Sequence, residues 1–96
     1  SASPIAWDIL DRNAFAFMTV PDRSAADCMK LLVSGNLGAR SIIAGESAVA
    51  GLAALLSCAD DLRRPLGLHP DSRILLFGTE GATDPDIYAK MTEHTL

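Results

Sequence analysis

Short apolar runs alternate with segments of helical periodicity along the chain, and this alternation constrains the fold more than any other feature. The apolar runs are residues 14–20, 41–44 and 73–77. Strands that alternate with helices imply crossover connections, and crossover connections produce a mainly parallel sheet. We therefore predict an α/β fold with three layers, in which helices cover both faces of a short, mainly parallel sheet.

The expected helices have clear start and stop signals. Ser3 before Pro4 reads as an N-cap followed by the first helical position, and Asp84 before Pro85 repeats this pattern. Gly35 is a typical helix terminator. These signals and the apolar spacing predict helices over residues 4–13, 23–34, 48–59 and 84–91, with a Pro- and Gly-broken connection over residues 62–70.

Length and charge exclude several classes of function. The 96 residues form a single unit at most, and three short strands make a thin sheet for a doubly covered fold, so we expect a piece of a larger domain. Twelve acidic against eight basic residues give a net charge of −4, which argues against nucleic acid and anionic membranes as partners. The longest apolar stretch, residues 48–56, is far shorter than the ~20 residues of a membrane span.

The cysteines and histidines do not form a recognisable metal motif. Cys28 and Cys58 lie in apolar helical contexts without Cys-x-x-Cys spacing, so we expect buried free thiols and no metal site. A reducing cytoplasm is the expected location. His69, in a turn, and His94, in the tail, lack ligand partners at metal-site spacing, and both are predicted to be exposed and structural.

Two polar turns follow the second and third apolar runs. Gly45, Glu46 and Ser47 follow the second run, and residues 78–81 (Gly-Thr-Glu-Gly) follow the third. A parallel sheet places both turns at the same edge, where ligands bind in α/β proteins, and if the two strands are neighbours, Glu46 and Thr79 converge on one ligand. The alternative interpretation is structural, because Glu in a first helical turn favours the helix dipole and Gly permits tight turns.

Four stretches together resemble a known enzyme family. They are residues 3–10 (SPIAWDIL), 44–52 (AGESAVAGL), 66–68 (LGL) and, above all, 79–88 (TEGATDPDIY). In order and spacing these stretches are similar to the C-terminal part of the diaminopropionate ammonia-lyase family. This resemblance places the chain among the fold type II pyridoxal-phosphate enzymes, the superfamily of the tryptophan synthase β chain. It covers residues 3 to about 91.

The resemblance implies a reaction and a set of cofactor contacts. It implies β-elimination of ammonia from 2,3-diaminopropionate to give pyruvate, with pyridoxal phosphate as cofactor. It implies Thr79 as the hydrogen-bond partner of the pyridine nitrogen, Glu46 near the same side of the ring, and cofactor contacts from Gly45 and Gly78. Related enzymes often carry Ser or Asn where this chain has Gly78, so the polar contact falls to Thr79.

The chain lacks part of the chemistry that this family needs. A pyridoxal-phosphate enzyme needs a lysine for its cofactor, but Lys30 and Lys90 lie in predicted amphipathic helices and are expected to be solvated. The lysine and the phosphate loop belong to a region N-terminal to this segment. We therefore assign no catalytic residue, and we expect the chain to be inactive alone.

The expected setting is residues 1–96 as a single C-terminal fragment that joins the rest of the enzyme, binds a small amino-acid substrate and forms a homodimer at full length. A split subunit and a degenerate relative remain alternatives to the fragment. For function, the alternatives are a threonine or serine dehydratase, or a non-catalytic module that binds a small ligand or a partner.

Overall fold

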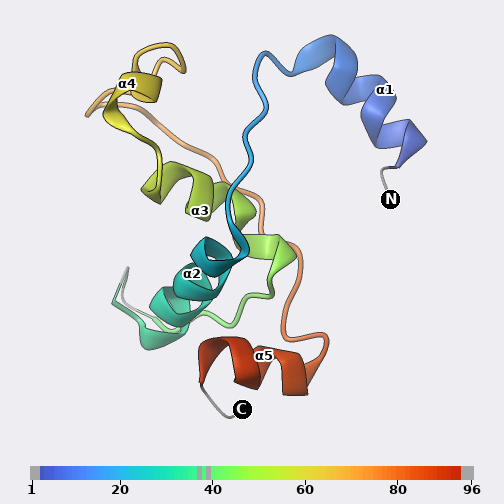
Figure 1. Cartoon of the computed structure of the whole chain (residues 1–96), viewed down its shortest axis with the longest axis vertical. Coiled ribbons are helices and arrows are strands. Elements are labelled where there is room, and N and C mark those ends of the chain that lie inside the picture. The colour runs from blue at the N-terminus through green and yellow to red at the C-terminus, as the bar shows by residue number, and fades with distance from the viewer. Residues whose placement is uncertain (1–2, 37, 39, 94–96) are drawn as a thin grey trace.

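The chain folds into short helices joined by long irregular segments (Figure 1). The computed structural model describes residues 3–36, 38 and 40–93. Its helices are α1 (Pro4–Asn13), α2 (Asp22–Ser34), the 3-10 helix η1 (Ser47–Val49), α3 (Ala50–Leu56), α4 (Asp60–Arg63) and α5 (Pro85–Thr92).

Local capping sets the ends of the main helices. The Ser3 hydroxyl accepts a hydrogen bond from the Ala6 amide at 3.3 Å and caps α1. Helix α2 ends at Gly35, whose φ of 78° is the left-handed conformation that glycine adopts without strain. Asp84 Oδ1 accepts from the amides of Asp86 and Ile87, both at 3.1 Å, and caps α5. The predicted helices over residues 4–13, 23–34 and 84–91 are confirmed within one residue at each end.

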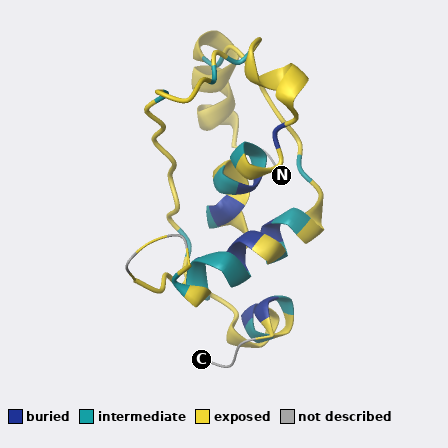
Figure 2. Ribbon diagram, turned by 90° about the vertical axis from the view of Figure 1, so that its left-hand side faces the viewer, coloured by how far each residue is buried: buried dark blue, intermediate teal, exposed yellow. Residues whose placement is uncertain are grey.

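A small core lies where α2 packs against α3, η1 and α5 (Figure 2). Met29 of α2 and Val49 of η1 are its largest fully buried side chains. The other buried members of the cluster are Ala25, Cys28, Ala44, Ala53 and Tyr88. Most of these side chains are small, which permits α2 to pack against η1 and α3.

The predicted parallel sheet is wrong. Within the described residues no strand is present, and no backbone hydrogen bond joins one of the three apolar runs to another. The runs are irregular connections that expose large apolar side chains: Phe15 is 80% exposed, Leu75 77% and Phe77 79%. A three-layer α/β architecture is therefore not the fold of this chain.

The sheet fails because strand pairing is not a local property. An apolar, β-prone run favours an extended backbone, but it becomes a strand only with a neighbour about 4.8 Å away over several residues. Here α2, η1, α3 and α5 bury their apolar faces against one another. Residues 41–44 follow α2 instead, with the Ile42 amide donating to Leu32 O at 2.9 Å. The radius of gyration, 14.7 Å, exceeds the ~13 Å of a compact 100-residue domain.

Two smaller corrections concern the middle of the chain. The single helix predicted over residues 48–59 is a 3-10 turn, η1, that continues into α3 and stops at Leu56. The predicted connection over residues 62–70 begins inside α4. Both cysteines are free and buried, as predicted. None of the helices in the described ranges combines the length and hydrophobicity that crossing a bilayer requires.

Candidate functional site

The two polar turns singled out in the sequence meet in the structure. The Gly45 amide donates to Glu80 O at 2.9 Å. This is a contact between segments 35 residues apart, and it brings the start of η1 against the connection that leads into α5. The two turns therefore lie together without a sheet, whereas convergence of Glu46 and Thr79 on one ligand stays a prediction.

The side chain of Glu80 strengthens this contact. Its Oε1 accepts a hydrogen bond from the Ser47 amide at 3.1 Å, at the first residue of η1. The amides at a helix start have no partner within the helix, and the helix dipole favours a carboxylate there. Glu80 therefore caps the N-terminus of the η1–α3 segment, although it lies in a distant part of the sequence.

Gly45 leaves no space for a side chain. A Cβ at this position would overlap Glu80 Oε1 and Gly81 O, and it would lie 2.9 Å from Glu80 Cδ. Gly45 is buried although it lies in a loop. The requirement for glycine is thus steric, since Gly45 is not among the glycines with positive φ.

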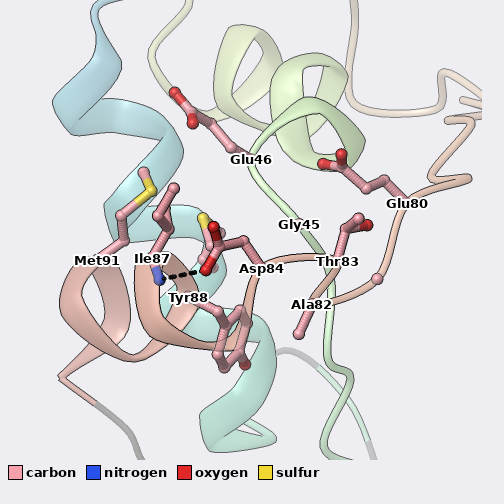
Figure 3. A pocket seen from close by; sticks show the side chains of 11 residues that line it. Gly45, Glu46, Glu80, Ala82, Thr83, Asp84, Ile87, Tyr88 and Met91 are labelled. Carbon is pink, nitrogen blue, oxygen red and sulfur yellow. Dashed lines mark hydrogen bonds between the residues drawn. The ribbon is translucent and has the colours of Figure 1, made fainter.

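A cavity of about 240 Å³ lies beside this contact (Figure 3). Gly45, Glu46 and the 80–84 segment line it on one side. Met29, Ile87 and Met91 form its apolar wall. The cavity therefore combines an apolar floor from α2 and α5 with three carboxylates, those of Glu46, Glu80 and Asp84.

The three carboxylates differ in their surroundings. Asp84 caps α5 and Glu80 accepts from Ser47, so each has a backbone partner. Glu46 is exposed, and Figure 3 shows its side chain directed away from that of Glu80. The cavity is therefore electronegative, which favours cations or hydrogen-bond donors over phosphate.

Tyr88 also lines the cavity, and the surroundings of its hydroxyl are unusual. The residue is only 2% exposed, and its hydroxyl has no hydrogen-bond partner among the described residues. Desolvation by burial raises the pKa of this phenol above its ordinary value. In Figure 3 the ring points away from the Asp84 carboxylate, so the hydroxyl does not join the three acids.

The structure separates the predicted site residues into two pairs. Gly45 and Glu46 line the cavity. Thr79 and Gly78 do not, and both are exposed on the connection just before Glu80. A Cβ at Gly78 would lie 3.3 Å from Ala48 O, so glycine permits a close approach to η1 there as well. Cofactor binding by these four residues stays a prediction.

The bridging role of Glu80 was not foreseen. The sequence signal for this role is a glutamate in a tight turn that also contains Gly78 and Gly81. A carboxylate in such a turn can reach the start of a helix that is distant in the sequence. In the sequence, Glu80 stands out only as part of the turn over residues 78–81. Its partner Ser47, 33 residues away, could not be read from local spacing.

The basic groups of the described chain lie away from the cavity. Lys30 Nζ is 4.0 Å from Glu93 Oε2, and Lys90 is exposed. His69 is exposed in a turn, where its Nδ1 accepts from the Asp71 amide at 3.3 Å, as its predicted structural role requires. His94 lies outside the described residues. No group of three or more His, Cys, Asp or Glu in the described part could hold a metal ion.

Comparison with known proteins relates the chain to one enzyme. It is 33% identical over 90 residues to diaminopropionate ammonia-lyase of Salmonella typhimurium. This match covers 88% of this chain and 22% of that protein. It is 32% identical over 94 residues to diaminopropionate ammonia-lyase of Escherichia coli strain K12, which covers 93% of this chain and 24% of that protein. The chain thus spans about a quarter of the length of these relatives and is distantly related to that part. No family model matches the chain. No solved structure does so either.

Proposed function

From this relationship we propose that the chain is part of a pyridoxal-phosphate-dependent ammonia-lyase that eliminates ammonia from 2,3-diaminopropionate to give pyruvate. In this proposal it supplies the side of the cofactor pocket that faces the pyridine ring. The observation that supports the proposal is the contact between Gly45 and Glu80, because it joins two of the stretches that resemble the family.

The chemistry of the cavity fits the ring side of the cofactor and not its phosphate side. The carboxylates of Glu46, Glu80 and Asp84 would repel a phosphate dianion, whereas they tolerate a ring nitrogen or an amino group. The apolar wall of Met29, Ile87 and Met91 suits one face of an aromatic ring. The phosphate must then be held by residues outside this chain.

Several residues have a role in this proposal. Thr79 is exposed on the connection just before Glu80, outside the cavity lining, and its hydroxyl can donate a hydrogen bond to an unprotonated ring nitrogen. Glu80 holds the turn at Gly45 against the connection that carries Thr79, and Gly45 keeps that approach close. Met29, Ile87 and Met91 contact one face of the ring. The cofactor, when bound, supplies the electron sink for removal of the α-proton and loss of the β-amino group.

The proposed enzyme needs residues beyond those of this chain. Neither Lys30 nor Lys90 lines the cavity, so the lysine that holds the cofactor must come from the part of the enzyme that this chain does not match. A hydroxyl cannot stabilise a protonated pyridine as a carboxylate does, and this favours prompt elimination over transamination. We further propose a cytoplasmic homodimer as the complete form.

A chimera tests the proposal directly. This chain replaces the matched quarter of the Salmonella typhimurium enzyme, and pyruvate release from 2,3-diaminopropionate is measured. Thr79→Val removes the hydroxyl while keeping the shape, and we expect kcat to fall about 10- to 100-fold. Thr19→Val, a similar change on an exposed connection, is the matched control and should leave kcat unchanged.

Other outcomes of the same assay point to other functions. Release of 2-oxo acids from threonine or serine in preference to 2,3-diaminopropionate would indicate a dehydratase. A folded chimera that binds the cofactor spectroscopically and eliminates nothing would indicate a non-catalytic binding module. Equal kcat for Thr79→Val and the unmodified chimera would remove Thr79 from the cofactor contacts.

A further inference from the structure

Helix α1 has no role in the proposed site, and it is not part of the core. It contacts no other helix within the described residues, and none of its residues is buried. In Figure 1 it stands apart from α2, α3 and α5. Within the described residues, α1 is therefore a capped helix of ten residues whose side chains are not packed against another helix.

The side chains of α1 are arranged for burial. Ile5 is 80% exposed, Ile9 54%, Trp7 52% and Leu10 45%. At 3.6 residues per turn, these four and Ala6 cover about 200° of the helix circumference. The charged residues occupy the remainder, where Asp8 and Arg12 form an ion pair at 2.8 Å.

One aromatic contact joins α1 to the connection that follows it within the described residues. The rings of Trp7 and Phe17 lie 6.0 Å apart between centroids, at an interplanar angle of 37°. Phe17 belongs to the connection between α1 and α2, and it is itself 63% exposed. Trp7 and Phe17 therefore extend the apolar side of α1 into one continuous docking surface, formed by Ile5, Trp7, Ile9, Leu10 and Phe17.

We propose that this docking surface binds, as a helix in a groove, the part of diaminopropionate ammonia-lyase that this chain does not match. The Escherichia coli relative leaves only about seven residues of the chain unmatched, so at least half of α1 lies within the related region. The same relative has about three quarters of its length outside the match. That polypeptide is the occupant, and taking it as the partner rests on the proposed function.

The geometry of the anchors specifies the kind of groove. Ile5 and Ile9 are one turn apart on one side of the helix, and Trp7 and Leu10 lie together on the other. Such a spacing is that of helices that place apolar anchors into a hydrophobic groove. The charged residues of α1, Asp8, Asp11 and Arg12, lie outside this arc, so the surface that it presents is apolar.

Co-expression tests the inference. A tagged copy of the full chain is expressed with the Escherichia coli enzyme that lacks the matched quarter, and the amount of enzyme segment captured per chain is measured. We expect capture with the natural chain. The double variant Ile5→Ala with Ile9→Ala should reduce capture at least about tenfold, because two large apolar anchors are removed. Alanine preserves helix formation, and circular dichroism checks it.

The matched control lies on the other side of the same helix. Asp8→Asn with Arg12→Gln removes the ion pair and leaves the docking surface intact, so capture should be unchanged. Absence of capture by the natural chain would overturn the inference, and so would equal capture by the Ile5/Ile9 variant. Self-association of the chain alone that disappears in the same variant would also overturn it, in favour of a second copy as occupant.

Lyase activity of the captured complex separates this inference from the proposed function. Capture that depends on Ile5 and Ile9, without pyruvate release, supports the docking surface and contradicts the proposed function. Pyruvate release with capture that is independent of Ile5 and Ile9 supports the proposed function and contradicts the docking surface.

Discussion

Replacement of Gly45 by alanine is the sharpest test of the contact between the two turns. The new methyl group would overlap Glu80 Oε1 and Gly81 O. Because Gly81 O is a backbone atom, rotation of the Glu80 side chain alone cannot relieve the overlap. The connection must therefore move away, which breaks the bonds from Gly45 N to Glu80 O and from Ser47 N to Glu80 Oε1.

The cost follows from these two bonds. A backbone hydrogen bond contributes about 1 kcal/mol net, and one to a carboxylate contributes about 1.5 to 3 kcal/mol. The lower value applies to Glu80, because its side chain is partly exposed and water can replace Ser47. Alanine also gains about 0.4 to 1 kcal/mol from reduced freedom of the unfolded chain. The net expected loss is therefore about 2 kcal/mol in the free energy of unfolding.

Urea unfolding measures this loss, and Gly81→Ala is the matched control. Gly81 lies in the same contact, but a Cβ there meets nothing within 4 Å, so this substitution should be neutral or slightly stabilising. The cost of Gly45→Ala is also measured in a chain that carries Glu80→Ala. It should be smaller there, and the difference between the two costs is the contribution of the Glu80 side chain. Equal unfolding midpoints for Gly45→Ala and Gly81→Ala would refute the reasoning.

Two further predictions concern α5 and the buried titratable groups. Asp84→Ala removes both bonds to the first amides of α5 and should cost about 1 kcal/mol of unfolding free energy in urea, whereas Asp86→Ala should cost less; equal costs would contradict the capping role. The pKa of the Cys28 thiol is raised by burial and by nearby Asp27, and burial raises that of Tyr88. Both groups hold their protons more tightly in the folded chain than in the unfolded chain. Their contribution to the free energy of unfolding should therefore be complete below pH 9.0 and decline as the pH rises further. Thermal unfolding of Tyr88→Phe should show a weaker alkaline decline, and an unchanged decline would exclude Tyr88 as a contributor.

The sequence predicts the parts of this fold that depend on neighbouring residues. Ser3 and Asp84 cap their helices by contacts within three residues, and Gly35 ends α2 through its own φ angle. Such features depend on local stereochemistry, so they can be read from a sequence. The three apolar runs differ, because an extended segment needs a neighbouring strand that local sequence does not specify.

The candidate site is predictable to a similar degree. The sequence identifies both turns, and the structure joins them through Gly45 and Glu80. The geometry by which they meet was not predictable, since parallel strand ends were expected and a carboxylate-capped 3-10 helix is present instead. Long-range side-chain contacts such as Ser47 with Glu80 depend on the packing of α2 and α3.

The lack of helix contacts around α1 has a consequence for how the chain loses structure. A ten-residue helix without tertiary packing is marginally stable in water, since helices below about 12 to 15 residues rarely persist alone. The amides of α1 should therefore exchange with solvent through local fraying, while those near Met29 in α2 exchange only when the core opens. The Ser3 cap and the Asp8–Arg12 ion pair bias α1 towards helix, so that less conformational entropy is lost when another surface covers it.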